Sequence, residues 1–183
     1  MNLIKSNESK NLVGCCGLYC GLCTKYQSRS PSRCLGCRIG EQHSWCSIWN
    51  CCVKKHKLDH CSECGELDEC AIFLRRKVRD WIPVADNLHR ILADGLENWL
   101  SEQMERQTAL EELLDQCNDG RSMSFYCRAC ARMPVELIHQ ALKQAEEIFA
   151  HHQAEAADMK AKAGIIKDVI KDLALQANIN LTH

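Results

Sequence analysis

Residues 15–23 read CCGLYCGLC, residues 34–37 CLGC, residues 45–52 WCSIWNCC and residues 60–64 HCSEC. Twelve of the fifteen cysteines in the chain lie between Cys15 and Cys70. Apolar residues in this segment come singly, so their burial offers too little free energy to offset the entropy of ordering the chain. A structural zinc site can contribute about 10–16 kcal/mol. The sequence therefore predicts a small, irregular, metal-bound module over residues 11–70.

Cysteine spacing identifies the strongest candidate ligands. Two cysteines separated by two residues can direct both sulfurs at one ion from a tight turn, and two such pairs complete a tetrahedral four-sulfur site. The pairs with this spacing are Cys20/Cys23, Cys34/Cys37 and Cys61/Cys64. The first two pairs form one set, and a second set could draw on Cys46, Cys51 or Cys52, Cys61 and Cys64.

The remaining cysteines of the segment divide into further ligands and spare thiols. Cys15 adjoins Cys16 and Cys51 adjoins Cys52, and each adjacent pair is expected to leave one thiol outside a metal site. We take Cys15 and Cys52 as the spare thiols, whose reactivity depends on whether their pKa is lowered. The predicted metal ligands are Cys16, Cys20, Cys23, Cys34, Cys37, Cys46, Cys51, Cys61, Cys64 and Cys70.

The ligand type allows two kinds of metal centre. Tetrahedral sulfur sites suit zinc or iron–sulfur clusters. Gly36 within the second pair and Gly65 after the third resemble zinc knuckles, whereas Cys16-x3-Cys20-x2-Cys23 provides three close thiolates that suit a [4Fe–4S] cluster. We expect zinc, with [4Fe–4S] clusters as the alternative. With so many thiolates nearby, His56 and His60 are expected to be solvated surface residues rather than ligands.

Composition limits the classes of function. The formal net charge is −1, and no apolar run approaches the roughly 20 residues of a membrane span, so we expect no membrane partner. The first residues, MNLIKSNESKN, lack the apolar core of a signal peptide. We therefore expect a cytoplasmic protein whose cysteines bind metal rather than form disulfides. The sequence contains no phosphate loop, G-x-S-x-G or His-Glu-x-x-His motif, which argues against an enzyme.

Basic and aromatic residues alternate between Lys25 and Lys57, a pattern that could bind a nucleic-acid backbone and stack bases. Acidic residues follow at once, so the basic stretch is short, and its cations could instead offset the negative charge of thiolate-bound metals. We therefore favour a protein partner over nucleic acid.

The rest of the chain, residues 71–183, is predicted to be a helical region. Apolar residues recur there at three- and four-residue steps, which is typical of amphipathic helices. The predicted fold is thus mainly α, with the cysteine-rich module packed on a bundle of four or five helices. Cys117 is expected to act as a small buried hydrophobe. The predicted helices span residues 68–79, 84–93, 96–117, 122–132, 134–149 and 157–177.

The motifs CGLYCGLC, SRCLGCR, WCSIWNCC and CSECGELDEC, followed by NLHRILADGLENWLSEQ at residues 87–103, resemble a bacterial and archaeal family of cysteine-rich proteins, domain of unknown function 3795. The resemblance covers about residues 13–130. It implies an intracellular metal-binding protein with no assigned activity, and it supports the unpaired cysteines Cys16, Cys46, Cys51 and Cys70 as ligands.

Two functional hypotheses follow from the sequence. The first is a non-catalytic module in which structural zinc-type sites, each with four cysteine ligands, shape a surface for a partner. The alternative is an iron–sulfur protein in electron transfer or redox maturation.

Overall fold

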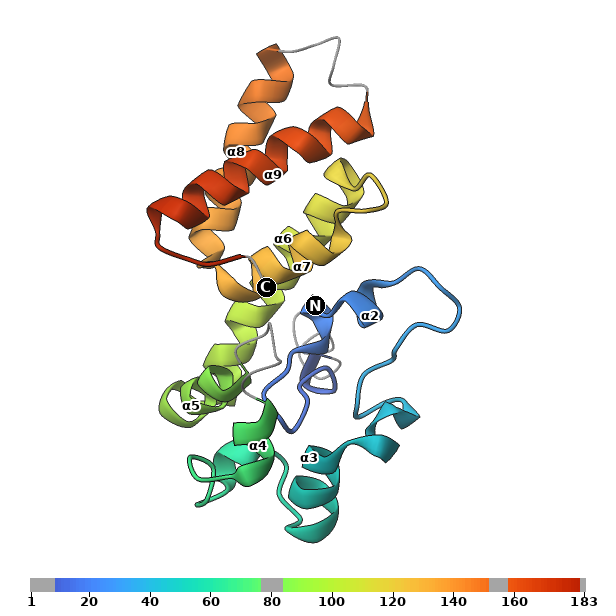
Figure 1. Ribbon diagram of the computed structural model, residues 1–183, viewed down its shortest axis with the longest axis vertical. Coiled ribbons are helices and arrows are strands. Elements are labelled where there is room, and N and C mark those ends of the chain that lie inside the picture. The colour runs from blue at the N-terminus through green and yellow to red at the C-terminus, as the bar shows by residue number, and fades with distance from the viewer. Residues whose placement is uncertain (1–8, 77–83, 152–157, 182–183) are drawn as a thin grey trace. The chain divides into compact units, whose positions relative to one another are not determined.

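A computed structural model describes residues 9–76, 84–151 and 158–181 (Figure 1). Over these residues the protein is mainly helical, which confirms the prediction of a mainly α fold, and it has an isolated antiparallel bridge between Val13 and Tyr19 in place of a sheet. Among the described helices, none combines the length and the apolar content that crossing a bilayer requires.

The chain divides into two compact units, Met1–Met104 and Glu105–His183. The first unit therefore contains the cysteine-rich segment together with the helices that follow it, as far as the middle of the longest helix. The predicted boundary near residue 70 marks the end of the ligand-bearing segment and stays a prediction, as does the packing of that segment on a helical bundle.

The cysteine-rich segment consists of short helical turns joined by loops. None of the turns exceeds six residues, and they are η1 (Cys20–Leu22), α2 (Thr24–Gln27), η2 (Glu41–Trp45), α3 (Ser47–Trp49), the π-helical η3 (Asn50–Lys55) and η4 (Cys61–Glu63). Two of the Cys-x-x-Cys pairs are themselves turns, because the N–H of Cys23 donates to the Cys20 carbonyl (2.9 Å) and that of Cys64 to the Cys61 carbonyl (3.1 Å). The segment is thus less irregular than its sequence suggests.

Three helices follow in chain order. They are α4 (Ala71–Arg76), α5 (Val84–Asp94) and α6 (Leu96–Cys117). Gly95 separates the last two with φ = 82°, a left-handed conformation that glycine adopts without steric cost. The predicted bounds of α5 and α6 agree with the structure to within one residue, whereas the predicted end of the preceding helix at residue 79 lies outside the described residues.

The core of the first unit forms between the cysteine-rich segment and the α5 and α6 helices. The Tyr19 ring meets the Trp99 ring edge-to-face, with centroids 6.3 Å apart and an interplanar angle of 86°. Leu88 of α5 is fully buried, as is Leu100 of α6. On the other side of the segment, Ile48 of α3 is buried as well. The cysteine-bearing turns therefore pack against this core.

The second unit contains the end of α6, α7 (Met123–Arg132), α8 (Val135–His151) and α9 (Met159–Gln176). Helices α8 and α9 pack side by side (Figure 1). The predicted start of the last helix at residue 157 lies outside the described residues. Arg106 of α6 is buried, and its Nη1 donates to the carbonyl oxygens of Cys130 (2.7 Å) and Met133 (2.5 Å), so it caps the end of α7.

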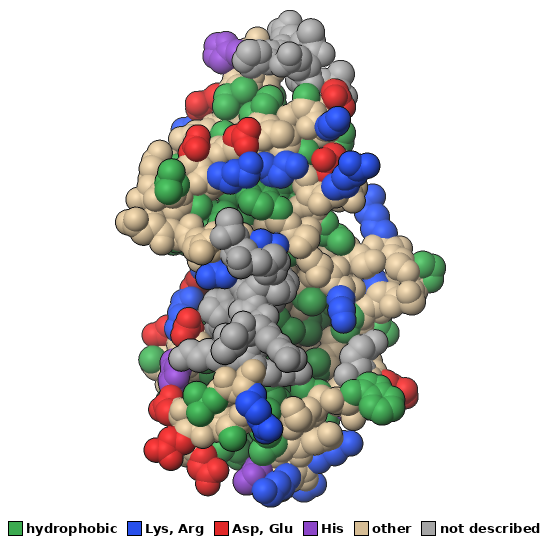
Figure 2. Space-filling model, viewed as in Figure 1, with side chains coloured by type: hydrophobic (Ala, Val, Ile, Leu, Met, Phe, Trp, Pro, Cys, Tyr) green, Lys and Arg blue, Asp and Glu red, His purple; other side chains and the backbone are tan. Residues whose placement is uncertain are grey.

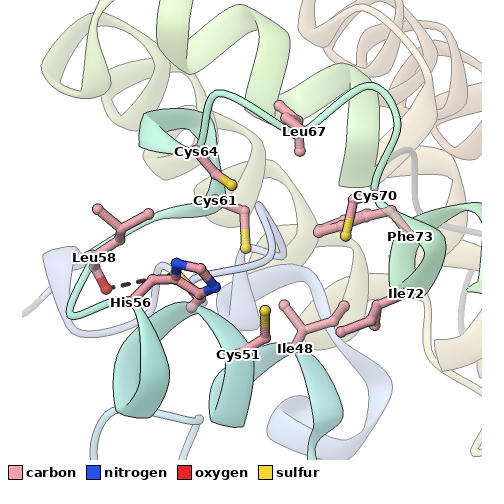
Figure 3. Close-up of a pocket in the computed structure, with 11 residues that line it drawn as sticks. Ile48, Cys51, His56, Leu58, Cys61, Cys64, Leu67, Cys70, Ile72 and Phe73 are labelled. Carbon is pink, nitrogen blue, oxygen red and sulfur yellow. Dashed lines mark hydrogen bonds between the residues drawn. The ribbon is translucent and has the colours of Figure 1, made fainter.

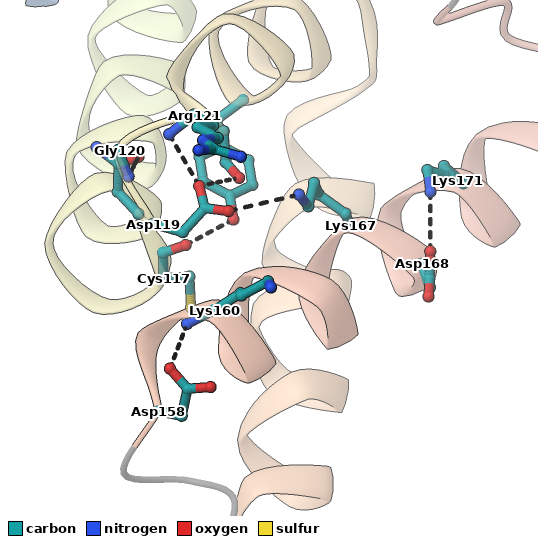
Figure 4. Close-up of polar contacts among 12 residues, drawn as sticks. Cys117, Asp119, Gly120, Arg121, Asp158, Lys160, Lys167, Asp168 and Lys171 are labelled. Carbon is teal, nitrogen blue, oxygen red and sulfur yellow. Dashed lines mark hydrogen bonds and ion pairs between the residues drawn. The ribbon is translucent and has the colours of Figure 1, made fainter.

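The turn between α6 and α7 is organised by Asp119 (Figure 4). Its carboxylate accepts hydrogen bonds from the Ser122 hydroxyl (2.6 Å) and the Arg121 N–H (3.0 Å), and Lys167 Nζ of α9 lies 4.0 Å away. The bond from Ser122, then that from Arg121, holds the pKa of Asp119 below its ordinary value. Nearby, the Tyr126 hydroxyl donates to the Cys117 carbonyl at 2.7 Å. Cys117 itself is buried, as expected for a small hydrophobe.

We predict that Asp119→Asn makes the second unit less stable at pH 7 and that this loss of stability is smaller near pH 3. A carboxyl whose folded-state pKa is depressed stabilises the fold above its unfolded pKa of about 4, and the contribution disappears as pH falls through the folded value. Hydrogen exchange of peptides from α7 and α9, followed by mass spectrometry at both pH values, measures this difference. Asp168→Asn is the control, since that side chain is exposed and pairs along its own helix with Lys171. Equal behaviour of the two variants would contradict the assignment.

Candidate metal centre

Cys15 and Cys16 sit at the tip of a tight loop. The N–H of Gly17 donates to the Gly14 carbonyl at 3.0 Å, and the N–H of Gly14 donates to the Leu18 carbonyl at 2.8 Å. Gly17 has φ = 82°, and a Cβ on it would lie 2.6 Å from the Val84 carbonyl oxygen at the start of α5. The loop can therefore approach α5 this closely only because residue 17 is glycine.

Three cysteines from three separate turns meet at one point. The sulfurs of Cys15, Cys52 and Cys61 all lie within 4.8 Å of one another, and all three side chains are buried. Cys15 comes from the tip loop, Cys52 from η3 and Cys61 from the start of η4. The backbone supports this arrangement, because the N–H of Cys61 donates to the Cys15 carbonyl at 2.8 Å. We call this group the cysteine triad.

The pKa values of the three triad thiols differ in direction from the ordinary value. The Cys61 thiol donates a hydrogen bond to Cys15 and so holds the pKa of Cys15 below its ordinary value, assisted by a bond from Cys52 and by the Arg38 guanidinium. The same bond raises the pKa of Cys61, and burial adds to the rise. Burial raises the pKa of Cys52 to about 12. One favoured thiolate at Cys15 and two thiols beside it form a site that a cation could enter by displacing protons.

Arg38 links the segments around the triad. Its Nε donates to the Val13 carbonyl (2.7 Å), and its Nη2 donates to the Asp59 carbonyl (2.7 Å) and lies 3.2 Å from His60 Nε2. His60 is buried, so the expectation that it is a solvated surface residue is wrong. Burial, and then the charge of Arg38, lowers its pKa. The His60 backbone N–H donates to Glu63 Oε1 at 3.2 Å, so His60 shapes the start of η4.

A second group of cysteines surrounds a cavity of about 30 Å³ next to the triad (Figure 3). The sulfurs of Cys51, Cys61, Cys64 and Cys70 point toward this space. The exposed His56 also contributes to its lining, and the other lining residues are Cys52 and the apolar Ile48, Leu58, Leu67, Ile72 and Phe73.

The first predicted four-sulfur set consists of Cys20, Cys23, Cys34 and Cys37. The structure brings these cysteines together in part. Cys20 and Cys37 are hydrogen-bonded through their side chains, and this bond, with burial, raises the pKa of Cys20. The N–H of Gly36 donates to Cys34 Sγ at 3.4 Å. The nearby charge of Cys23 raises the pKa of Cys20 further. These four sulfurs are not drawn as tightly together as the triad, which is the group of described metal-binding side chains within 4.8 Å.

The two remaining predicted ligands lie near these groups. Burial raises the pKa of Cys16 to about 12, although the N–H of Leu18 donates to its sulfur and opposes the rise. Cys46 directly precedes α3 and interacts electrostatically with Cys16. Both side chains are half-buried.

Sequence reasoning left Cys15 out of the metal sites and gave Cys52 only as an alternative to Cys51, although both belong to the triad. Successive side chains of a helix point about 100° apart, so two adjacent cysteines can face two different groups. Cys51 and Cys52 do this in η3, because Cys51 lines the cavity and Cys52 joins the triad. Two adjacent cysteines in the sequence were therefore the signal that could have located the triad. Such a pair indicates two groups of sulfurs rather than one spare thiol.

No protein-family model matches the chain, and neither the curated proteins nor the solved structures that were compared with it contain a match.

We predict that Gly17→Ala destabilises the first unit by roughly 2 kcal/mol or more and weakens metal binding. The new methyl group would collide with the Val84 carbonyl and with Leu88, and the left-handed backbone adds strain. Urea unfolding of the first unit and metal content, measured together, test this. Gly65→Ala is the matched control, since its Cβ would meet nothing within 4 Å. If both variants unfold at the same urea concentration, the close approach of the loop to α5 is not required.

Proposed function

We propose that the protein binds metal through the cysteine triad, with zinc as the ion, and that the metal shapes a non-catalytic surface for a protein partner. The observation that carries the proposal is the meeting of three buried sulfurs within 4.8 Å. The resemblance to the cysteine-rich family implies a protein of the same kind.

The chemistry of the three donors supports a metal ion. Buried polar groups require partners, and these thiols have mainly one another, since the Cys52 thiol also reaches the Leu58 carbonyl at 3.5 Å. No disulfide joins any cysteine of the described residues, and an odd set of three cannot pair internally. Thiolates around one tetrahedral zinc lie about 3.8 Å apart, given a Zn–S bond of about 2.3 Å. A small contraction of the triad would therefore complete three of four positions.

A fourth ligand can come from a nearby cysteine. Cys37 and Cys16 both interact electrostatically with Cys15, so either could supply the fourth thiolate. Arg38, which adjoins Cys37, would offset part of the negative charge that several thiolates bring to a dielectric lower than that of water.

Zinc is the proposed ion because three sulfurs this close enclose a single ion rather than a cluster of irons and sulfides. The alternative is an iron–sulfur protein with a role in electron transfer or redox maturation, and it predicts a different absorption spectrum. Protein purified without oxygen would then be brown, with absorbance near ~400 nm, whereas the zinc protein is colourless.

A surface for a partner lies on the same segment. Leu35, Ile39 and Trp45 are exposed apolar side chains, and the Trp45 side chain is 93% accessible. Next to them, His43 stacks on Trp49 with ring centroids 4.5 Å apart. Charged side chains of both signs occur on the face drawn in Figure 2, which favours a protein partner over a nucleic acid.

We predict that Cys52→Ser weakens zinc binding by at least about 100-fold, because loss of even an outer-shell partner of a ligand costs about 10–100-fold. Elemental analysis and competition with a chromophoric chelator measure the effect. Cys117→Ser is the matched control, since Cys117 is equally buried but lies in the second unit. Equal loss of metal in both variants would overturn the assignment of the triad.

A further inference from the structure

We infer that the cavity beside the triad is a second metal site, formed by Cys51, Cys64 and Cys70, and that it shares Cys61 with the triad. The two ions would then be bridged by the Cys61 thiolate. This inference rests on the proposed function, because it extends metal binding from the triad to its neighbour.

A repeating turn places three of these cysteines on one side of the cavity. The N–H of Cys64 donates to the Cys61 carbonyl (3.1 Å), that of Leu67 to Cys64 (3.2 Å) and that of Cys70 to Leu67 (3.3 Å). Such turns repeat every three residues, so side chains at residues 61, 64, 67 and 70 share one side. Residues 61, 64 and 70 bring sulfur to the cavity, and Leu67 brings an apolar side chain.

The fourth sulfur comes from the opposite side of the cavity. Cys51 of η3 points toward Cys61, Cys64 and Cys70 (Figure 3). The cavity of about 30 Å³ exceeds the roughly 10–15 Å³ that one water molecule requires, so a single ion fits without displacing protein atoms. Apolar neighbours such as Ile48 and Phe73 surround the sulfurs and shield them from competing water.

Cys61 is the residue on which the sharing depends. Its sulfur lies within 4.8 Å of the Cys15 and Cys52 sulfurs, and its side chain also lines the cavity with Cys64 and Cys70. The sulfurs around the cavity must draw closer to bind an ion, because the sulfurs within 4.8 Å of one another among the described residues are those of the triad. Cys52 lies at the border of the two sites as well, so the triad and the cavity form one continuous group of sulfurs.

Electrostatics favours a shared thiolate. Two separate four-thiolate sites with divalent ions would carry a charge of −2 each, or −4 in total. When Cys61 is shared and Cys16 or Cys37 is the fourth ligand of the triad, the two sites have seven thiolates, which with two divalent ions carry −3 in total. Because charge is costly to remove from water and the triad has Arg38 as its neighbouring cation, the smaller charge is the more stable arrangement.

Metal equivalents in single variants of the full-length protein, loaded with zinc alone, test the inference. Cys15→Ser and Cys70→Ser should each lose about one equivalent relative to the wild type, Cys61→Ser about two, and Cys117→Ser none. Loss of one equivalent in Cys61→Ser, or of none in Cys70→Ser, would overturn the shared site while leaving the triad intact. If the wild type binds no metal, the proposed function fails with it.

Titration of the wild-type protein with Co²⁺ provides a readout that does not depend on how the variants fold. Cobalt ions bridged by one thiolate couple magnetically, so the electron paramagnetic resonance signal should rise with the first equivalents and fall as the second site fills. Sulfur-to-cobalt charge-transfer absorbance should increase throughout. A resonance signal that grows in proportion to cobalt until saturation would show that the sites share no ligand.

Discussion

The buried contact among the sulfurs of Cys15, Cys52 and Cys61 is the constraint on which the N-terminal half of this structure depends. Each sulfur comes from a different turn, so their meeting fixes the relative positions of the tip loop, η3 and η4. The turns themselves are too short to be stable alone. Apolar support comes from a few side chains, such as Tyr19 and Ile48, which are fully buried. A metal ion at the triad would add the largest single contribution to this segment.

Other contacts within the first unit help to hold the same turns in place. Gly17 lets the tip loop approach α5, where Asn87 Nδ2 donates to the Gly17 carbonyl at 2.9 Å. Arg38 ties the loop to residues 59 and 60 and places a positive charge beside the sulfurs. The Tyr19 and Trp99 rings then connect the segment to α6. The cysteine-rich segment thus packs against α5 and α6, and the exposed apolar side chains of residues 35–45 lie elsewhere on the same segment.

The sequence predicted the helices well and the site incompletely. Helical periodicity and the Asp94-Gly95 terminator located α5 and α6, because these signals act within a few residues. The Cys-x-x-Cys pairs likewise predicted turns, which the hydrogen bonds at Cys20 and Cys61 form. Which sulfurs meet depends instead on loops that connect distant turns, and no local signal specifies it. For this reason Cys15 was left out of the site and Cys52 was only an alternative to Cys51. His60 was likewise expected at the surface, although it is buried beside Arg38.

The central claim is that metal holds the cysteine-rich segment in its folded state. Limited proteolysis of the protein with and without metal, both under reducing conditions, tests it most directly, with circular dichroism recorded on the same samples. We predict that removal of the metal exposes sites between residues 11 and 70, while α7, α8 and α9 remain resistant and most of the helical signal persists. Survival of residues 11–70 as a resistant fragment in fully demetallated, reduced protein would contradict the account.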